Sequence, residues 1–93
     1  MKVRYTATAL SEIEDILTYI AKDDPSAALR VSVTILSTID RVADFPHIAI
    51  ESNVPDVRVA PVLPYRYLVF FSFTEGVLVV RNVRHSGRER ANL

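Results

Sequence analysis

A chain of 93 residues can fill only one hydrophobic core, so we expect a single domain spanning residues 1–93. Hydrophobic residues make up 49% of the chain, with only 2 glycines and 5 prolines, which excludes a disordered or fibrous protein. The lack of cysteine and the presence of only 2 histidines argue against disulfides and a zinc cluster, and we expect neither a metal ion nor a cofactor.

A short strand and a helix are the first predicted elements. In MKVRYT, Val3 and Tyr5 alternate with Lys2 and Arg4, which predicts a strand with one buried face. From Thr8 the apolar spacing becomes helical, and acidic residues in the early turns suit the positive end of the helix dipole. The apolar positions of this helix are Ala9, Ile13, Ile16, Leu17 and Ile20.

A second helix follows directly. Asp24 suits an N-cap and Pro25 the first helical position, so we expect this helix to run from Pro25 to about Asp44. One apolar stripe comprises Ala28, Val31, Ile35, Ile39 and Val42. A second stripe, about 100° around the helix, comprises Leu29, Val33 and Leu36. We expect the first stripe to face a sheet and the second to face the first helix; alternatively, the second stripe is an exposed binding surface.

Three strands complete the predicted fold. Period-two alternation returns in DVRVAPV, YRYLVFFSFT and GVLVVRNVR, after the loop FPHIAIESNVP. The last two strands join around Thr74, Glu75 and Gly76, where glycine can adopt the positive φ of a short turn. The order β-α-α-β-β-β predicts an α+β fold with the N-terminal strand and helical hairpin on one face of a mainly antiparallel sheet.

The same alternation predicts an apolar sheet face that the helices leave uncovered. We expect it to contain Leu68, Phe70, Leu78 and Val80, flanked by Arg58, Arg66 and Arg84. Exposed apolar patches of this size mark binding sites, and the uncharged segment YLVFFSF would favour aggregation if it stayed open. We therefore expect another polypeptide to cover this face; the alternative is a tight homodimer.

Charge is distributed unevenly along the chain. Residues 1–56 contain 5 basic and 9 acidic side chains, whereas residues 57–93 contain 6 basic and 2 acidic ones. The C-terminal part therefore predicts a positive surface for nucleic acid or an acidic partner. Alternatively, carboxylates and guanidinium groups meet across the fold and cancel.

No targeting or membrane segment is evident in the sequence. The N-terminal MKVRYTATAL lacks an apolar stretch of signal-peptide length. No uninterrupted apolar run approaches the ~20 residues that span a bilayer. We expect a cytoplasmic protein without a membrane partner.

Three segments together carry a family resemblance. The element order, with AALRVSVTILSTIDRVADFP, VRVAPVLPYRYLVFFSF and VRNVRHSGRER, resembles the ParE/RelE superfamily of toxins from type II toxin-antitoxin modules over nearly the whole chain. The resemblance implies a cognate antitoxin, which would cover the apolar face formed by Leu68, Phe70, Leu78 and Val80. A homodimer or a heterotetramer with antitoxin remains open.

The final segment HSGRER is more similar to the ParE branch, whose members inhibit DNA gyrase without being nucleases and stabilise a plasmid or chromosomal locus. This resemblance implies a positive surface that binds the target or another anion. Its arginines would be Arg58, Arg66, Arg84, Arg88 and Arg90.

The RelE branch implies a different activity, ribosome-dependent cleavage of mRNA. Arg66 and Arg88 resemble two arginines of such enzymes, and His85 is the candidate for proton transfer because imidazole exchanges protons near neutrality. Alternatively, His85 only ends a strand through a hydrogen bond to the backbone or to a carboxylate. However, VRV replaces the lysine pair these enzymes often carry, and their C-terminal tyrosine would fall past Leu93. Whether the chain is an enzyme stays open. A third possibility is a decayed module that retains only antitoxin binding or dimerisation.

Overall fold

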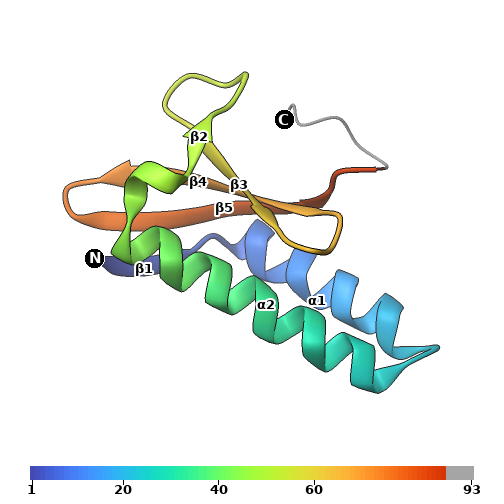
Figure 1. Cartoon of the computed structure of the whole chain (residues 1–93). Coiled ribbons are helices and arrows are strands. Elements are labelled where there is room, and N and C mark those ends of the chain that lie inside the picture. The colour runs from blue at the N-terminus through green and yellow to red at the C-terminus, as the bar shows by residue number, and fades with distance from the viewer. Residues whose placement is uncertain (88–93) are drawn as a thin grey trace.

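The computed structural model describes residues 1–87 as a five-stranded sheet with two helices on one face (Figure 1). Its elements are β1 (Lys2–Tyr5), α1 (Ala7–Ala21), α2 (Pro25–Asp44), a 3-10 turn (Pro46–Ile48), β2 (Ile50–Glu51), β3 (Arg58–Val62), β4 (Tyr67–Thr74) and β5 (Val77–His85). The strand order is β1-β5-β4-β3-β2; β1 runs parallel to β5, and the other neighbours are antiparallel. The predicted α+β architecture is confirmed, while β2 was absent from the prediction.

Side-chain caps fix where the two helices begin. Asp24 accepts a hydrogen bond from Ala27 N–H at 3.0 Å, so α2 starts at Pro25 as predicted. Thr6 accepts one from Ala9 N–H at 3.0 Å, which starts α1 one residue earlier than expected. These caps satisfy backbone donors that the first helical turn leaves without partners.

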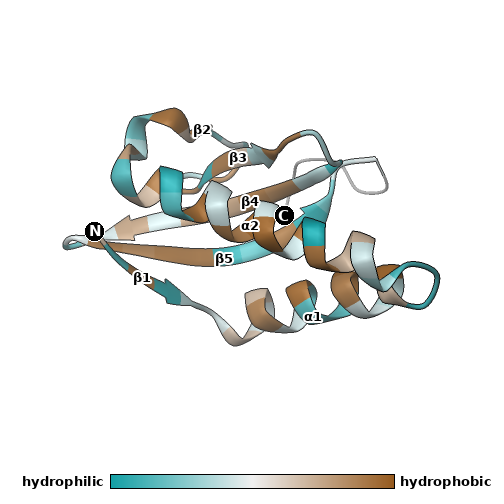
Figure 2. Cartoon of the chain, turned by 60° about the horizontal axis from the view of Figure 1, so that its bottom comes forward, coloured by the Kyte–Doolittle hydropathy of each residue, from teal (hydrophilic) through white to brown (hydrophobic). Residues whose placement is uncertain are grey.

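The main core lies between α2 and the sheet. All five residues of the first predicted α2 stripe are buried, and Ile35, Ile39 and Val42 are fully so. All of them except Ala28 join one cluster with buried side chains of the sheet. In Figure 2, hydrophobic and polar residues alternate along α2, where it crosses in front of the strands. The prediction that this stripe faces the sheet is confirmed.

The second α2 stripe behaves differently. Leu29, Val33 and Leu36 are 66%, 58% and 49% exposed, so the prediction that they pack on α1 is wrong. α1 lies beside α2 on the same sheet, so it contacts α2 at positions close to the sheet-facing stripe. The second stripe, formed by Leu29, Val33 and Leu36, is left on the outside. The structure agrees with the alternative of an exposed surface.

The predicted open sheet face is also largely absent. Leu78 and Val80 are fully buried and belong to the core beneath the helices. The cause is a bulge, because Phe70 pairs with Asn82 while Phe71 pairs with Val80, so that the residue between them on β5 has no partner on β4. That extra residue reverses the alternation on which the prediction relied.

Phe70 does lie on the face away from the helices, but the chain itself covers it. It is fully buried in a second cluster with Val57 and Val59, against which Val54 and Leu68 are partly buried. Figure 1 shows the loop after β2 on this side of the sheet. The exposure expected for Phe70, Leu78 and Val80 is therefore wrong, and Leu68 is only partly accessible.

Candidate functional site

Four residues lie where β4 begins and β5 ends, and we refer to them as the strand-end cluster: Arg66, Tyr67, His85 and Gly87. Tyr67 and His85 are paired across the strands, and their rings meet edge to face with centroids 5.3 Å apart. Ser86 N–H donates to the Arg66 carbonyl at 2.8 Å, which holds the chain after β5 against the start of β4. The sheet therefore brings Arg66 and His85 together, as candidates for one site.

The backbone after β5 orients the His85 imidazole. Gly87 N–H donates to His85 Nδ1 at 3.0 Å, so Nε2 is the ring nitrogen left to carry a proton. A Cβ atom added at Gly87 would lie 2.9 Å from His85 Cε1 and 3.5 Å from Arg66 Nη1. Both side chains therefore lie close to Gly87, and a larger residue there would displace the imidazole.

Arg66 supplies a free positive charge to the cluster. Its side chain is exposed and makes no hydrogen bond or ion pair with any other residue in the described range 1–87. A guanidinium group of this kind can bind a carboxylate or phosphate through two parallel hydrogen bonds. The cluster can therefore bind an anion, with the imidazole as a second polar contact.

Arg84, which the sequence analysis assigned to a free positive surface, is paired with a carboxylate of α1. Its Nε lies 3.7 Å from Glu12 Oε2 on α1, and both side chains are about one quarter exposed. The structure therefore supports the alternative in which a carboxylate and a guanidinium group from distant parts of the chain pair with each other. Its positive charge is partly neutralised before any partner binds.

Arg58 is separate from the other predicted cations. It is paired with Phe71, and its Nη1 donates to the Ala49 carbonyl at 3.1 Å. Its position in the ladder places it about 16 Å along β4 from Arg66. The expectation of one face flanked by Arg58, Arg66 and Arg84 is therefore wrong, and Arg88 and Arg90 lie outside the described residues.

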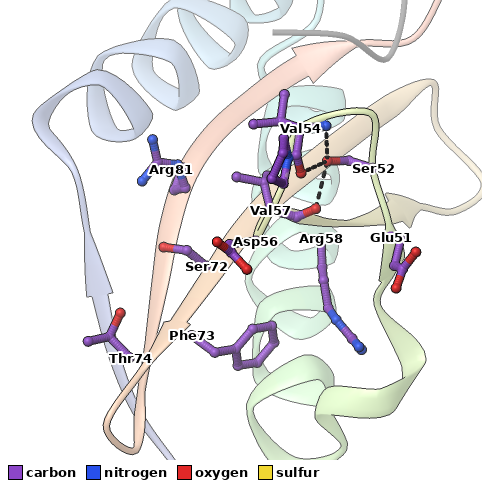
Figure 3. Close-up of a pocket in the computed structure, with 11 residues that line it drawn as sticks. Glu51, Ser52, Val54, Asp56, Val57, Arg58, Ser72, Phe73, Thr74 and Arg81 are labelled. Carbon is purple, nitrogen blue, oxygen red and sulfur yellow. Dashed lines mark hydrogen bonds between the residues drawn. The ribbon is translucent and has the colours of Figure 1, made fainter.

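Arg81 was missed by the sequence analysis. It is the extra residue of the β5 bulge, and its exposed guanidinium has no hydrogen-bond or ion-pair partner within residues 1–87. Figure 3 shows it at the side of an open groove, with Ser72 and Asp56 in between and Arg58 beyond them. Because a bulge leaves no signature in a run such as VLVVRNVR, no sequence signal identified this residue.

Two other kinds of site find no support in the described part of the chain. No cluster of three or more histidine, aspartate or glutamate side chains within residues 1–87 could hold a metal ion. Neither described helix has the length and apolarity needed to cross a membrane.

Two solved structures share this arrangement. A chain of the chromosomal ParDE TA system from P. aeruginosa superposes with a TM-score of 0.81 at 17% identity, covering 91% of this chain and 95% of that one. YafQ from E. coli gives a TM-score of 0.55 at 13% identity, covering 92% and 93% of the two chains. At such identities these likenesses establish the fold alone.

Sequence comparison defines the family. The protein Y4kP of Sinorhizobium fredii is 27% identical over 88 residues, which covers 95% of this chain and 91% of that protein. Residues 3–90 match the family of the ParE toxin of the type II toxin-antitoxin system parDE, and the chain belongs to this family. The predicted resemblance to the ParE branch is confirmed, and the protein is a toxin of the type II class.

Proposed function

We propose that this ParE-family toxin inhibits DNA gyrase and is neutralised by a cognate antitoxin in the cytoplasm. The family match over residues 3–90 is the observation that carries the proposal. The strand-end cluster supports it, because the Arg66 guanidinium, which has no partner within residues 1–87, offers beside His85 an anchor for an acidic segment of the target or for a DNA phosphate. Binding of this kind needs no chemical step.

The geometry supports inhibition by binding more than nuclease activity. RNA cleavage at the 2′-hydroxyl needs a base, an acid and cations for the phosphate. Within residues 1–87, the cluster contains one imidazole, and the nearby Glu12 carboxylate already accepts hydrogen bonds from Asn82 and Val83 and pairs with Arg84.

An antitoxin partner follows from the kind of assemblies that the relatives form. The similar P. aeruginosa structure belongs to a ParDE system, and a similar E. coli structure is the DinJ-YafQ toxin-antitoxin complex. Arg66 immediately precedes β4, and the partly exposed Leu68 is two residues further on, so an acidic and apolar segment of an antitoxin would find both contacts together. Such a segment would mask the same guanidinium that we assign to target binding, and so prevent toxicity.

The second candidate is a ribosome-dependent mRNA endoribonuclease. Arg66 and His85 favour it, because a cation and an imidazole lie side by side at the end of the sheet. In that case the candidate catalytic residues would be Arg66, His85 and Arg88, of which Arg88 lies outside the described range.

Inducible expression in a bacterial host distinguishes the two candidates within one culture. We expect loss of plasmid supercoiling, an induced DNA-damage response and filamentous growth, with intact mRNA by primer extension. Codon-positioned mRNA cuts with normal supercoiling would establish the endoribonuclease instead. Normal growth with neither effect would indicate a decayed module.

A further inference from the structure

The backbone determines which nitrogen of the His85 ring carries the proton. Gly87 N–H donates to His85 Nδ1 at 3.0 Å, and because an amide N–H can only donate, Nδ1 must be the unprotonated nitrogen. The neutral imidazole therefore holds its proton on Nε2. The edge-to-face contact with Tyr67, whose ring plane is at 90° to the imidazole, restrains the plane of the ring as well. Nε2–H itself has no hydrogen-bond partner within residues 1–87.

The Arg66 guanidinium lies beside this N–H donor. His85 Cε1 and Arg66 Nη1 are both within 3.5 Å of the point that a Cβ atom at Gly87 would occupy. The bond from Ser86 N–H to the Arg66 carbonyl, at 2.8 Å, keeps the end of β5 against the start of β4. A guanidinium group and an Nε2–H group are donors without an acceptor. The pair therefore suits an anion with several acceptor oxygens and offers nothing to a group that must itself donate.

The same geometry opposes a role for His85 as a base. To take up a proton, the neutral ring would need an unprotonated Nε2, so its own proton would have to sit on Nδ1. Two N–H groups, those of Nδ1 and Gly87, would then face each other, and the bond at 3.0 Å would be lost. The chain after β5 therefore favours a ring that donates through Nε2.

The direction of the two donors favours phosphate over carboxylate. A carboxylate is planar, and the two parallel bonds that it accepts from one guanidinium group lie in its plane. A phosphate group is tetrahedral, so its oxygens point in several directions. Arg66 precedes β4 and His85 ends β5, so their donors approach an anion from two different strands. A tetrahedral anion can meet both donors at once.

We propose that Arg66 and His85 form a phosphate-binding site, in which the guanidinium group and the neutral Nε2–H group hold one phosphate together and His85 is a donor rather than a base. This inference rests on the proposed function and names its contact, a phosphate of the nucleic acid in the target complex. The terminal phosphate of a nucleotide has the same chemistry, so the experiment includes probes that distinguish the two sources.

NMR spectroscopy of the full chain with ¹⁵N-labelled histidine, produced by cell-free synthesis to avoid toxicity, tests the position of the proton. The chain has only 2 histidines, and His47→Gln assigns their signals. We expect long-range proton–nitrogen correlations to show the Nε2–H form for His85. His47 is exposed and makes no hydrogen bond through its side chain in the described range, so it is the internal reference. A His85 ring protonated mainly on Nδ1 overturns the proposal.

Titration with small anions tests the preference for phosphate. Dimethyl phosphate and acetate each carry a single negative charge, so at constant ionic strength they differ in shape rather than in charge. We expect dimethyl phosphate to shift the ring signals of His85 saturably, with a dissociation constant in roughly the millimolar range, and acetate to bind at least about fivefold more weakly. Acetate binding as tight as that of dimethyl phosphate overturns the proposal and assigns the site to carboxylates of an acidic peptide.

Two further probes identify the source of the phosphate. A short DNA duplex should shift the same ring signals and bind more tightly than inorganic phosphate at the same ionic strength, because the duplex presents many phosphates. Shifts with inorganic phosphate but not with the duplex would overturn the nucleic-acid source and leave a terminal phosphate. Unchanged signals with every phosphate probe overturn the site itself.

Two variants of His85 separate a donor from a base. His85→Gln retains an N–H donor on a side chain of similar reach, whereas His85→Phe retains only a ring. Followed through the backbone signals of Ser86 and Gly87, dimethyl phosphate should bind to His85→Gln within about threefold of the parent and to His85→Phe at least about tenfold more weakly. Equal losses in the two variants, with both shown to be folded by circular dichroism, contradict the donor role.

The outcome for the site is independent of the outcome for gyrase. A chain that inhibits gyrase while its ring signals ignore phosphate refutes the phosphate site and leaves the proposed function intact. A chain that binds phosphate through Arg66 and His85 but leaves gyrase unimpaired refutes the proposed function instead.

Discussion

Glu12 of α1 accepts a hydrogen bond from the backbone N–H of Val83 on β5 at 3.0 Å. β1 pairs with β5 only as far as Val80, so beyond this point the edge of β5 needs another acceptor. Glu12 supplies it, and the same carboxylate bonds to Asn82 Nδ2 and pairs with Arg84. One helix side chain therefore secures the strand that ends at the strand-end cluster.

Glu12→Ala should lower the free energy of unfolding by about 1–3 kcal/mol, because Val83 is buried and its N–H would lose its partner. Glu12→Gln keeps an acceptor oxygen and should lose less. Urea denaturation gives both values. Glu14→Ala, at an exposed position of the same helix, should stay within about 0.5 kcal/mol of the parent and serves as the control.

Two adjacent residues of α2 separate the buried stripe from the exposed one. Ile35 is fully buried, so Ile35→Ala should cost about 2–5 kcal/mol through the cavity that it leaves. Leu36 is 49% exposed, and Leu36→Ala should cost clearly less when measured by urea denaturation. Equal losses at the two positions would contradict the orientation of α2.

Much of the fold could be predicted from the sequence because the local signals agreed. Asp24 and Pro25 gave the start of α2, and the spacing from Ala28 to Val42 gave its buried face. The buried face of β5 could not be predicted, because the bulge at Arg81 reverses the side-chain alternation of this strand without any change in composition.

The functional residues were predictable only in part. The sequence named Arg66 and His85 together only through the RelE resemblance, and the hairpin of β4 and β5 is what places them near each other. The engagement of Arg84 by Glu12 could not be predicted, because these residues are 72 positions apart and no local pattern joins them. The covering of Phe70 depends on a long loop whose path the sequence does not define.

Gly87→Ala tests the geometry of the strand-end cluster. The new methyl group would lie 2.9 Å from His85 Cε1, so the imidazole or the backbone must move. We expect reduced toxicity, a changed His85 ring signal in the NMR spectrum and a small change in stability, because Gly87 is exposed. Ser86→Ala, at the neighbouring exposed position, is the control. An unchanged ring signal would show that the close approach is not maintained in solution.

Alkaline pH should destabilise the fold through Tyr5. Burial, with a further contribution from the Asp40 carboxylate, raises the pKa of Tyr5 above its ordinary value of 10.0. The folded chain therefore holds this proton more tightly than the unfolded chain. The stabilisation is complete below about pH 10 and is lost as the pH rises through the folded-state pKa. Tyr5→Phe should flatten the decline of unfolding free energy above about pH 10; an unchanged slope would exclude Tyr5 as its source.

Arg66→Ala should abolish or strongly reduce toxicity on induced expression while changing the unfolding free energy by less than about 0.5 kcal/mol, because the side chain is exposed. Arg66→Lys should retain little of the toxicity, since an ammonium group cannot form the two parallel hydrogen bonds that a guanidinium group forms. Arg4→Ala, at an exposed position on β1, controls for loss of one positive charge. Full toxicity of Arg66→Ala would remove this residue from the site.

The supercoiling activity of purified DNA gyrase, titrated with the purified chain, tests the central claim most directly. We predict dose-dependent loss of supercoiling that Arg66→Ala abolishes, that Arg4→Ala leaves unchanged and that the antitoxin encoded beside the gene reverses. Unimpaired supercoiling at a several-fold molar excess of a folded chain that is toxic in cells would contradict gyrase as the target.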